Sequence, residues 1–367
     1  MTSELESGFP FISYPFFAFI FGLIIGSFLN VVIRRVPRGE SIVFPGSRCP
    51  ACGNPIRSID NIPLISYLLL RGRCHNCDMR ISLVYPTVEF LTGLIFAAII
   101  YKTDLRWEAL LDMVFASVML ALIFIDALHR LLPNLITYPA FIFAMVAATV
   151  RGGWGEQPIH TFDISILFTV EAAEFVVWRA ALFGGLLFVL AAPGFWMLDR
   201  LDLILFNKFL EWEEMDEEPE AVDKATDHRY RRAVITTMIL GLALAVIWAV
   251  AVIKFSPNDK ETYESAYDGL LRASVSALIG SGFIWWLRAA YFYIRGLEGM
   301  GLGDVKMMSI IGAFLGWQSM FSVLLLGSIL GVVIGLVLAY RSKRGLKTAL
   351  PFGVCLGVAA LIVLLMG

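Results

Sequence analysis

Four of the five cysteines in this chain fall into two closely spaced pairs. Cys49 and Cys52 form the first C-x-x-C pair, Cys74 and Cys77 form the second, and 21 residues separate the two pairs. Four thiolates in a tetrahedral array suit zinc, and they leave no open coordination position, so we expect a structural metal. His75 lies inside the second pair as an alternative ligand. Redox-active pairs are the competing interpretation, and they would require a thioredoxin-like strand and helix around each C-x-x-C.

Two aspartates lie where long apolar runs meet polar sequence. Asp126 stands in LIFIDALHRLLPN, and Asp304 follows a glycine-rich turn in GMGLGDVKMM. Ionisable groups within or beside membrane spans are candidate functional sites. Two carboxylates that share a proton act as base and acid on one water, as in aspartic proteases. Either aspartate alone would be explained as a helix cap or a solvated helix end, so the hypothesis rests on the pair.

The elements that must position these residues are membrane-spanning helices. Hydrophobic residues make up 58% of the chain, charged residues 16%, and the mean hydropathy is +0.76. A helix needs about 20 apolar residues to cross the bilayer, and lipid leaves no partner for an unpaired backbone. We therefore predict an all-α polytopic membrane protein with about 8–10 transmembrane helices and a cytoplasmic tetracysteine zinc loop. The predicted spans are 14–34, 86–101, 109–128, 134–150, 180–198, 233–253, 269–291, 304–318, 319–340 and 350–366.

The distribution of basic residues predicts the orientation. Residues 1–33 contain no Lys or Arg, whereas eight Arg lie between Arg34 and Arg80. By the positive-inside rule the N-terminus is outside and the loop 35–85 is cytoplasmic. The same topology places the basic sequence at 341–347 and both aspartates at the cytoplasmic face. The first apolar run lacks a basic region before it, so it is not read as a cleavable signal peptide.

The chain divides into five predicted regions. These are a first transmembrane helix (1–34), the zinc-binding loop (35–85), helices carrying the first aspartate (86–150), an insert-like region with extra helices (151–291), and the GxGD motif with the C-terminal helices (292–367). The insert-like region contains an acidic cytoplasmic loop at 199–232, in which residues 211–223 hold eight acids and no Lys or Arg. Such a run is typical of a solvated segment, with partner docking as the alternative.

Taken in order, these motifs resemble the type IV prepilin peptidase family. The resemblance is carried by GSFLNVVIRRVP (26–37), the cysteine loop with the following ISLVYPTVEFLTG (49–93), IDALHRLLPNLIT (125–137), GMGLGDVKMM (299–308) and LPFG (350–353). It covers roughly half of the chain. The order and the joint specificity of the segments make coincidence a poor explanation.

The resemblance implies roles for particular residues. Asp126 and Asp304 take the catalytic positions, and the four cysteines take the zinc positions. The implied reaction cleaves the basic leader of prepilins or pseudopilins, of pilus and type II secretion systems, after a glycine at the cytoplasmic face of the inner membrane. Many members then methylate the new N-terminus with S-adenosylmethionine, although no glycine-rich methyltransferase motif is visible here. Membrane lipid is an expected partner, and nucleic acid is not.

The chain departs from the family pattern at Asn134, where the family has Asp, and in a longer stretch between the two aspartates. Glu89 and Lys306 are further polar residues within the matched segments; we consider leader or methyl-donor binding for Glu89 and an electrostatic or anchoring role for Lys306. Three alternative functions remain at this point. They are a catalytically degenerate zinc-loop scaffold of a pilus or secretion system, a proton-coupled transporter, and a GxGD-type intramembrane protease with other substrates.

Overall fold

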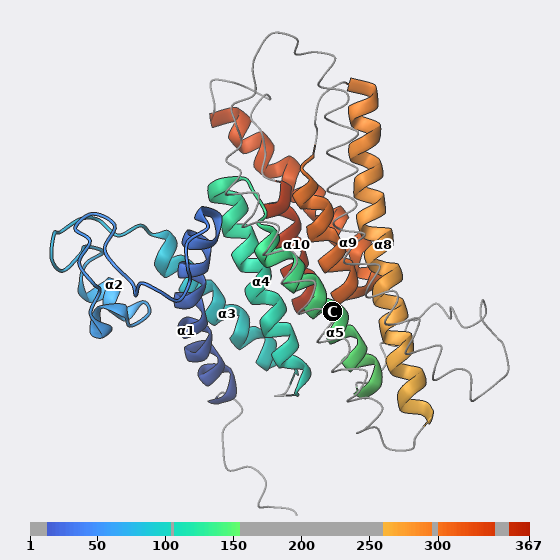
Figure 1. The fold of residues 1–367 in the computed structure, drawn as a ribbon, viewed down its shortest axis with the longest axis horizontal. Coiled ribbons are helices and arrows are strands. Elements are labelled where there is room, and N and C mark those ends of the chain that lie inside the picture. The colour runs from blue at the N-terminus through green and yellow to red at the C-terminus, as the bar shows by residue number, and fades with distance from the viewer. Residues whose placement is uncertain (1–12, 104–105, 155–259, 296–299, 342–351) are drawn as a thin grey trace, which may run out of the picture. The chain divides into compact units, whose positions relative to one another are not determined.

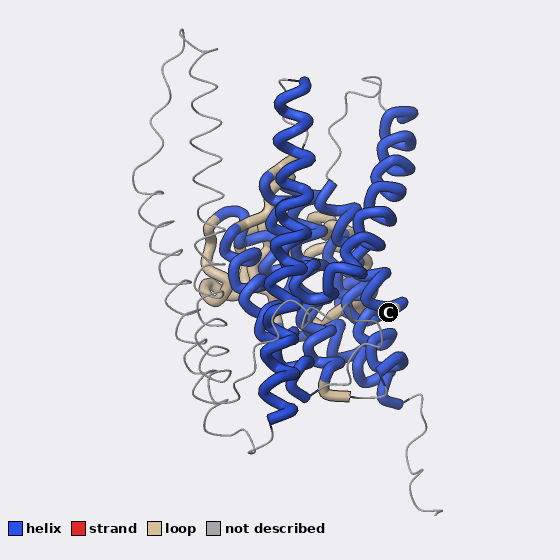
Figure 2. Tube along the Cα trace, turned by 90° about the vertical axis from the view of Figure 1, so that its right-hand side faces the viewer, coloured by secondary structure: helices blue, strands red, loops and turns tan. Residues whose placement is uncertain are grey.

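The computed structural model describes residues 13–103, 106–154, 260–295, 300–341 and 352–367. All regular secondary structure in these residues is helical, and only two isolated β-bridges occur among them (Figure 2). Six of the described helices are long and apolar enough to cross a membrane. The predicted all-α membrane class is therefore confirmed. The predicted spans 180–198 and 233–253 and the acidic loop 199–232 lie outside the described residues.

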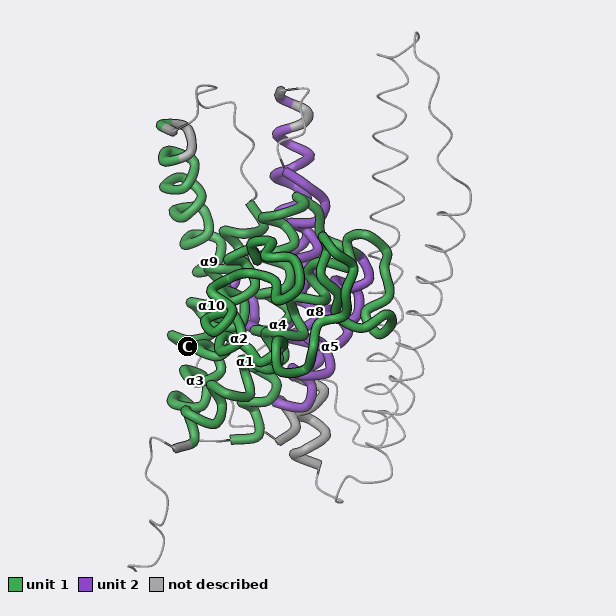
Figure 3. Tube along the Cα trace, turned by 90° about the vertical axis from the view of Figure 1, so that its left-hand side faces the viewer, with its two compact units in different colours: residues 1–133, 321–367 green, residues 134–320 purple. Residues whose placement is uncertain are grey.

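The helices follow the predicted apolar runs closely (Figure 1). They are α1 (Ser13–Arg35), the short α2 (Ile65–Leu69), α3 (Val84–Thr103), α4 (Glu108–His129), α5 (Asn134–Trp154), α8 (Lys260–Arg295), α9 (Leu302–Arg341) and α10 (Phe352–Met366). Short 3₁₀ turns cover Val36–Arg38 and Ser58–Asn61. The chain forms two compact units, residues 1–133 with 321–367 and residues 134–320 (Figure 3).

The first unit is built around a close contact between α1 and α3. Gly22 and Gly26 form a GxxxG pattern on α1, the spacing that lets two membrane helices approach closely. A Cβ at Gly22 would lie 2.7 Å from the Cα of Gly93, and one at Gly26 would lie 2.6 Å from the Cα of Glu89. Only hydrogen fits at these two positions. The contact holds together the two helices between which the cysteine loop runs, and α4 packs against both α1 and α3 and also against α10.

The second unit contains α5, α8 and the first part of α9. A Cβ at Gly312 of α9 would lie 2.6 Å from the carbonyl oxygen of Ser276 on α8, so these helices also approach at a glycine. Phe314 stacks on Phe143 of α5, with ring centroids 6.0 Å apart, and the guanidinium of Arg151 lies 4.4 Å from the centroid of the same ring. These contacts fix the α9 segment that begins just before Asp304.

The long α9 contains one residue that is not helical. Gly316 has φ 84° and ψ 163°, a backbone conformation that favours glycine because it lacks a Cβ. The sequence predicts two helices here, 304–318 and 319–340. The structure places the break two to three residues earlier, at Gly316. A residue with a Cβ would be strained in this backbone conformation.

Candidate active site and tetracysteine centre

The two cysteine pairs have the same local fold. In each pair the N–H of the first cysteine donates to the carbonyl five residues later, and its own carbonyl accepts from the N–H four residues later. An isolated β-bridge closes each loop, between Arg48 and Pro55 in the first and between Arg73 and Arg80 in the second. The residue after each second cysteine has a left-handed backbone; at Gly53, φ is 70°. The sequence therefore folds into two equivalent knuckles, each presenting two sulfur atoms.

The four cysteine sulfurs converge on one point. All four Sγ atoms lie within 4.8 Å of one another, and those of Cys49 and Cys77 are 3.8 Å apart. Zinc–sulfur bonds of about 2.3 Å in a regular tetrahedron put the sulfurs about 3.8 Å apart, so the donor set and its spacing suit a zinc ion. None of the four forms a disulfide. The described residues around them form no strand, which removes the thioredoxin-like setting that the redox interpretation required.

The charges of the thiols also favour a cation. The backbone N–H groups of Cys52 and Ala51 lower the pKa of Cys49 to about 6, which favours the thiolate, the form that binds a metal. The N–H of Met79 lowers the pKa of Cys77, but desolvation and the three neighbouring sulfurs outweigh it and raise that pKa to about 12. Without a metal, four neighbouring thiols cannot all ionise, because their negative charges would repel one another. A bound divalent ion compensates those charges.

The loop is anchored to the membrane helices by polar side chains. The amide nitrogen of Asn30 on α1 donates to the carbonyl of Tyr85 at 3.0 Å, and Arg34 donates to the hydroxyl of the same tyrosine at 2.5 Å. The buried carboxylate of Glu89 on α3 accepts the N–H of Leu64, the residue before α2, at 2.9 Å. Leu64 has φ 56°, so the carboxylate bonds a backbone group held in an uncommon conformation.

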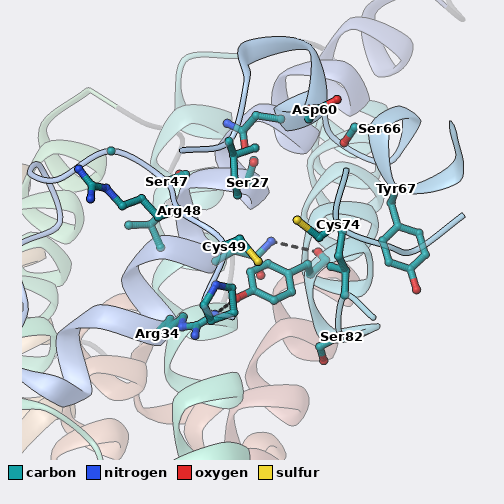
Figure 4. Close-up of a pocket in the computed structure, with 18 of the residues that line it drawn as sticks. Ser27, Arg34, Ser47, Arg48, Cys49, Asp60, Ser66, Tyr67, Cys74 and Ser82 are labelled. Atoms are coloured by element: carbon teal, nitrogen blue, oxygen red, sulfur yellow. Dashed lines mark hydrogen bonds between the residues drawn. The ribbon is translucent and has the colours of Figure 1, made fainter. Parts of the chain in front are cut away.

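A cavity of about 1080 Å³ lies between this loop and the ends of α1 and α3. Figure 4 shows part of its lining, which includes Arg34, Arg48, Cys49 and Cys74. The lining is of mixed charge and includes Glu89 as well as the arginines. A cavity of this size and chemistry suits a polar, zwitterionic small molecule or a short peptide.

Asp126 lies in the last turn of α4, in the first unit, and is 8% exposed. Its Oδ2 accepts the N–H of Val354, the third residue of α10, at 3.0 Å. The first N–H groups of a helix have no partner within it, and the positive end of the helix attracts negative charge. Asp126 therefore caps α10 with one carboxylate oxygen. The turn that ends α4 is closed by Arg130, whose backbone is left-handed and whose N–H donates to the carbonyl of Asp126.

Asp304 lies in the second unit, in the first turn of α9, and is also 8% exposed. Its N–H donates to the carbonyl of Gly301 at 3.2 Å, which forms the turn into the helix. Two residues later, the buried ammonium of Lys306 donates to Oδ1 of Asn134 at 2.8 Å and lies 5.6 Å from the centroid of the Tyr138 ring. Lys306 is thus a buried group held by the start of α5, rather than an exposed interfacial anchor.

Family models match two parts of the chain. Residues 20–103 match the bacterial peptidase A24 N-terminal domain, and residues 225–336 match the type IV leader peptidase family. Together the two matches span more than half of the sequence. The chain belongs to the type IV leader peptidase family. The first match contains the tetracysteine loop and Glu89, and the second contains Asp304 and Lys306; Asp126 falls between them.

Curated relatives extend the similarity over nearly the whole chain. The prepilin leader peptidase/N-methyltransferase of Aeromonas hydrophila is 29% identical over 388 aligned residues, covering 99% of this chain and 94% of the relative. The protein of the same name from Myxococcus xanthus is 45% identical over 139 residues, 38% of this chain and 42% of the relative. That from Pseudomonas aeruginosa is 24% identical over 371 residues, 95% and 89% of the two chains. No solved structure matches the chain.

Several hydrogen-bond partners of these residues could not be found from the sequence. The LPFG sequence (350–353) suggested no role, and the structure shows that its last two residues, Phe352 and Gly353, begin the helix whose Val354 N–H bonds Asp126. Likewise, Glu89 and Leu64 are 25 residues apart and give no pattern. Both bonds use a backbone N–H as donor, a group that every residue except proline has. Asn134 and Lys306 were each visible as polar residues, but nothing in their spacing predicted that they would pair.

Proposed function

We propose that this chain is a membrane aspartyl endopeptidase that removes the leader from type IV prepilins or pseudopilins and then methylates the new N-terminus. The observation that carries the proposal is membership of the type IV leader peptidase family, with relatives named prepilin leader peptidase/N-methyltransferase along nearly the full chain. The helical membrane fold and the converging cysteines are consistent with it.

Asp126 and Asp304 are the proposed catalytic pair. One carboxylate accepts a proton from a water molecule while the water oxygen forms a bond to the scissile carbonyl carbon. The other, protonated, hydrogen-bonds the carbonyl oxygen and then gives its proton to the leaving amine as the carbon–nitrogen bond breaks. Their surroundings support this role. Each is nearly buried and stands at a helix end, Asp126 against the start of α10 and Asp304 in the first turn of α9.

The zinc proposed for Cys49, Cys52, Cys74 and Cys77 has a structural role. Zinc would fix the two knuckles relative to each other, and with four sulfur ligands it has no position for water or substrate. The loop between α1 and α3 has little buried apolar surface of its own, since most of its side chains are exposed. Metal binding would therefore supply most of the free energy that holds its fold.

For methylation we propose S-adenosylmethionine as the donor and the cavity beside the cysteine loop as its site. The donor supplies an activated methyl group. Arg34 and Arg48 suit its carboxylate, Glu89 and Asp60 suit its amino group, and the cavity is large enough to hold it. These residues would bind and orient the donor.

We further propose that the protein resides in the inner membrane with the cysteine loop in the cytoplasm. The eight arginines between Arg34 and Arg80 support that orientation through the positive-inside rule. The substrate's apolar helix would then lie in the bilayer, and its basic leader would meet the enzyme at the interface, where water is available for hydrolysis.

The test is reconstitution of the purified chain with a prepilin in phospholipid vesicles, with and without S-adenosylmethionine. Mass spectrometry of the product should show loss of the leader after a glycine, and one added methyl group only when the donor is present. An uncleaved prepilin, with the protein folded and loaded with zinc, would favour the degenerate-scaffold alternative. Proton flux without cleavage would favour the transporter. Cleavage without methylation would retain the peptidase and reject the donor site.

A further inference from the structure

The short helix α2 in the tetracysteine loop has its apolar side turned outward. Ser66, Tyr67 and Leu70 face inward and line the cavity. On the opposite side Leu68 and Leu69 are 74% and 75% exposed, and Ile65, one turn earlier, is exposed too. Residues three and four apart share one helix face, so these side chains form a single apolar surface.

Two more apolar side chains of the same loop are exposed. Ile59 in the preceding 3₁₀ turn is 74% exposed, and Leu83, immediately before α3, is 69% exposed. We call these five side chains the loop apolar face: Ile59, Ile65, Leu68, Leu69 and Leu83. A loop surrounded by water would turn such residues toward its cavity, and exposed apolar patches of this kind mark contact with lipid or with another protein.

The anchor of α2 shows where this face lies relative to the bilayer. The N–H of Leu64 bonds the carboxylate of Glu89, which is the sixth residue of α3. At 1.5 Å per residue Glu89 lies about 7.5 Å along the helix axis from Val84. Since α3 has 20 residues, it needs its whole length to span about 30 Å of hydrocarbon. The start of α2 therefore lies at a depth within the membrane boundary. Figure 1 shows α2 alongside α1 rather than beyond its end.

Interfacial amphipathic helices bind membranes at the same depth as the start of α2. Such helices bury an apolar face about 5–10 Å into the boundary between headgroups and acyl chains, and they carry basic residues that meet lipid phosphates. Arg71 and Arg73, both exposed, follow α2 directly. The left-handed Arg71 and the bond from the N–H of Gly72 to the carbonyl of Tyr67 end the helix there. Apolar side chains and adjacent guanidinium groups thus occur together.

We propose that the loop apolar face is inserted in the phospholipid interface, so that the tetracysteine loop is a membrane-bound element rather than a domain in the aqueous phase. The occupant of the face is lipid: acyl chains against Leu68 and Leu69, and anionic headgroups against Arg71 and Arg73. Bilayer contact would hold the cavity beside α1 and α3 at the level of the membrane surface. The proposal does not depend on which reaction the cavity serves.

The experiment places the photo-crosslinker p-benzoylphenylalanine at position 69 of the full chain, in vesicles of phosphatidylethanolamine and phosphatidylglycerol without substrate. The matched control carries it in place of Asn76, an exposed polar residue of the second knuckle. Equal zinc content in both proteins reports an intact loop. After illumination, mass spectrometry should show phospholipid adducts at position 69 at least about fivefold above those at position 76.

Lipid adducts at position 69 no higher than at position 76 would overturn the proposal. So would adducts at position 69 that form with protein instead of lipid. If such protein adducts appear only when a prepilin is added, the face is a substrate-docking surface. If they join two copies of the chain, it is a self-association surface.

Discussion

The bond between Glu89 and Leu64 gives a quantitative prediction for how the tetracysteine loop is held. The Glu89 side chain is buried and accepts the Leu64 N–H at 2.9 Å. A hydrogen bond to a charged group contributes about 1.5–3 kcal/mol, and 1.4 kcal/mol corresponds to about tenfold in an equilibrium constant. In Glu89→Ala the local opening of the loop should become about 10- to 100-fold more favourable.

The Glu89→Gln variant distinguishes the effect of the negative charge from that of the hydrogen-bond acceptor. Its amide oxygen can still accept the Leu64 N–H, so only the charge assistance is lost, roughly 1 kcal/mol or about fivefold. Glu40→Gln is the matched control, because Glu40 is an exposed acid in the same loop and makes no bond to α2.

The assay is hydrogen–deuterium exchange in lipid nanodiscs, read by mass spectrometry with fragmentation that isolates the amide of Leu64. Exchange reports the free energy of local opening. The Leu64 amide should exchange fastest in Glu89→Ala and more slowly in Glu89→Gln. It should exchange slowest, and at equal rates, in wild type and Glu40→Gln. Unchanged exchange of Leu64 in Glu89→Ala, at equal zinc content, would refute the bond and the depth assigned to α2.

Three further predictions concern the metal, the helix packing and the buried lysine. Chelation of zinc, or Cys52→Ser, should expose the loop to limited proteolysis while the membrane helices remain assembled; resistance of the loop would contradict a structural metal. Gly26→Ala should lower the free energy of unfolding by about 1–3 kcal/mol, because its Cβ would lie 2.6 Å from a backbone atom of α3. Gly282→Ala should leave it unchanged, because a Cβ there would have no atom within 4 Å. Thermal unfolding in detergent distinguishes the two variants. Lys306→Met should reduce the rate of prepilin cleavage at least about tenfold. Asn134→Asp should keep the wild-type rate, because it would pair the buried ammonium with a carboxylate. Equal rates in wild type and both variants would exclude a role for Lys306.

The membrane helices were predictable because hydropathy reports directly on contact with lipid. The prediction for α4 was 109–128, and the helix spans Glu108–His129. The prediction for α8 began at 269, but the helix begins at Lys260. Its first residues, KETYESAYD, are polar and charged, so they extend the helix without adding an apolar signal. Hydropathy detects the part of a helix that lies in hydrocarbon and misses the rest.

The cysteine cluster was predictable for a different reason, since C-x-x-C spacing itself determines how two sulfurs reach one ion. The structure adds the equivalence of the two knuckles, which comes from backbone hydrogen bonds. The partners of Asp126 and Glu89 were not predictable, because both accept a backbone N–H from a distant segment. Nor was the outward orientation of α2, since ISYLL reads as an ordinary buried turn until its neighbours are known.

The central claim is that Asp126 and Asp304 together catalyse leader cleavage. The most direct measurement compares cleavage of a co-expressed prepilin by wild type, Asp126→Asn and Asp304→Asn at equal protein levels and zinc content. Asparagine keeps the size and polarity of each side chain but cannot exchange a proton with water. We expect cleavage by wild type alone, with each variant reduced at least about 1000-fold, as when one member of a cooperating catalytic set is removed. Undiminished cleavage by either variant would contradict the aspartyl mechanism.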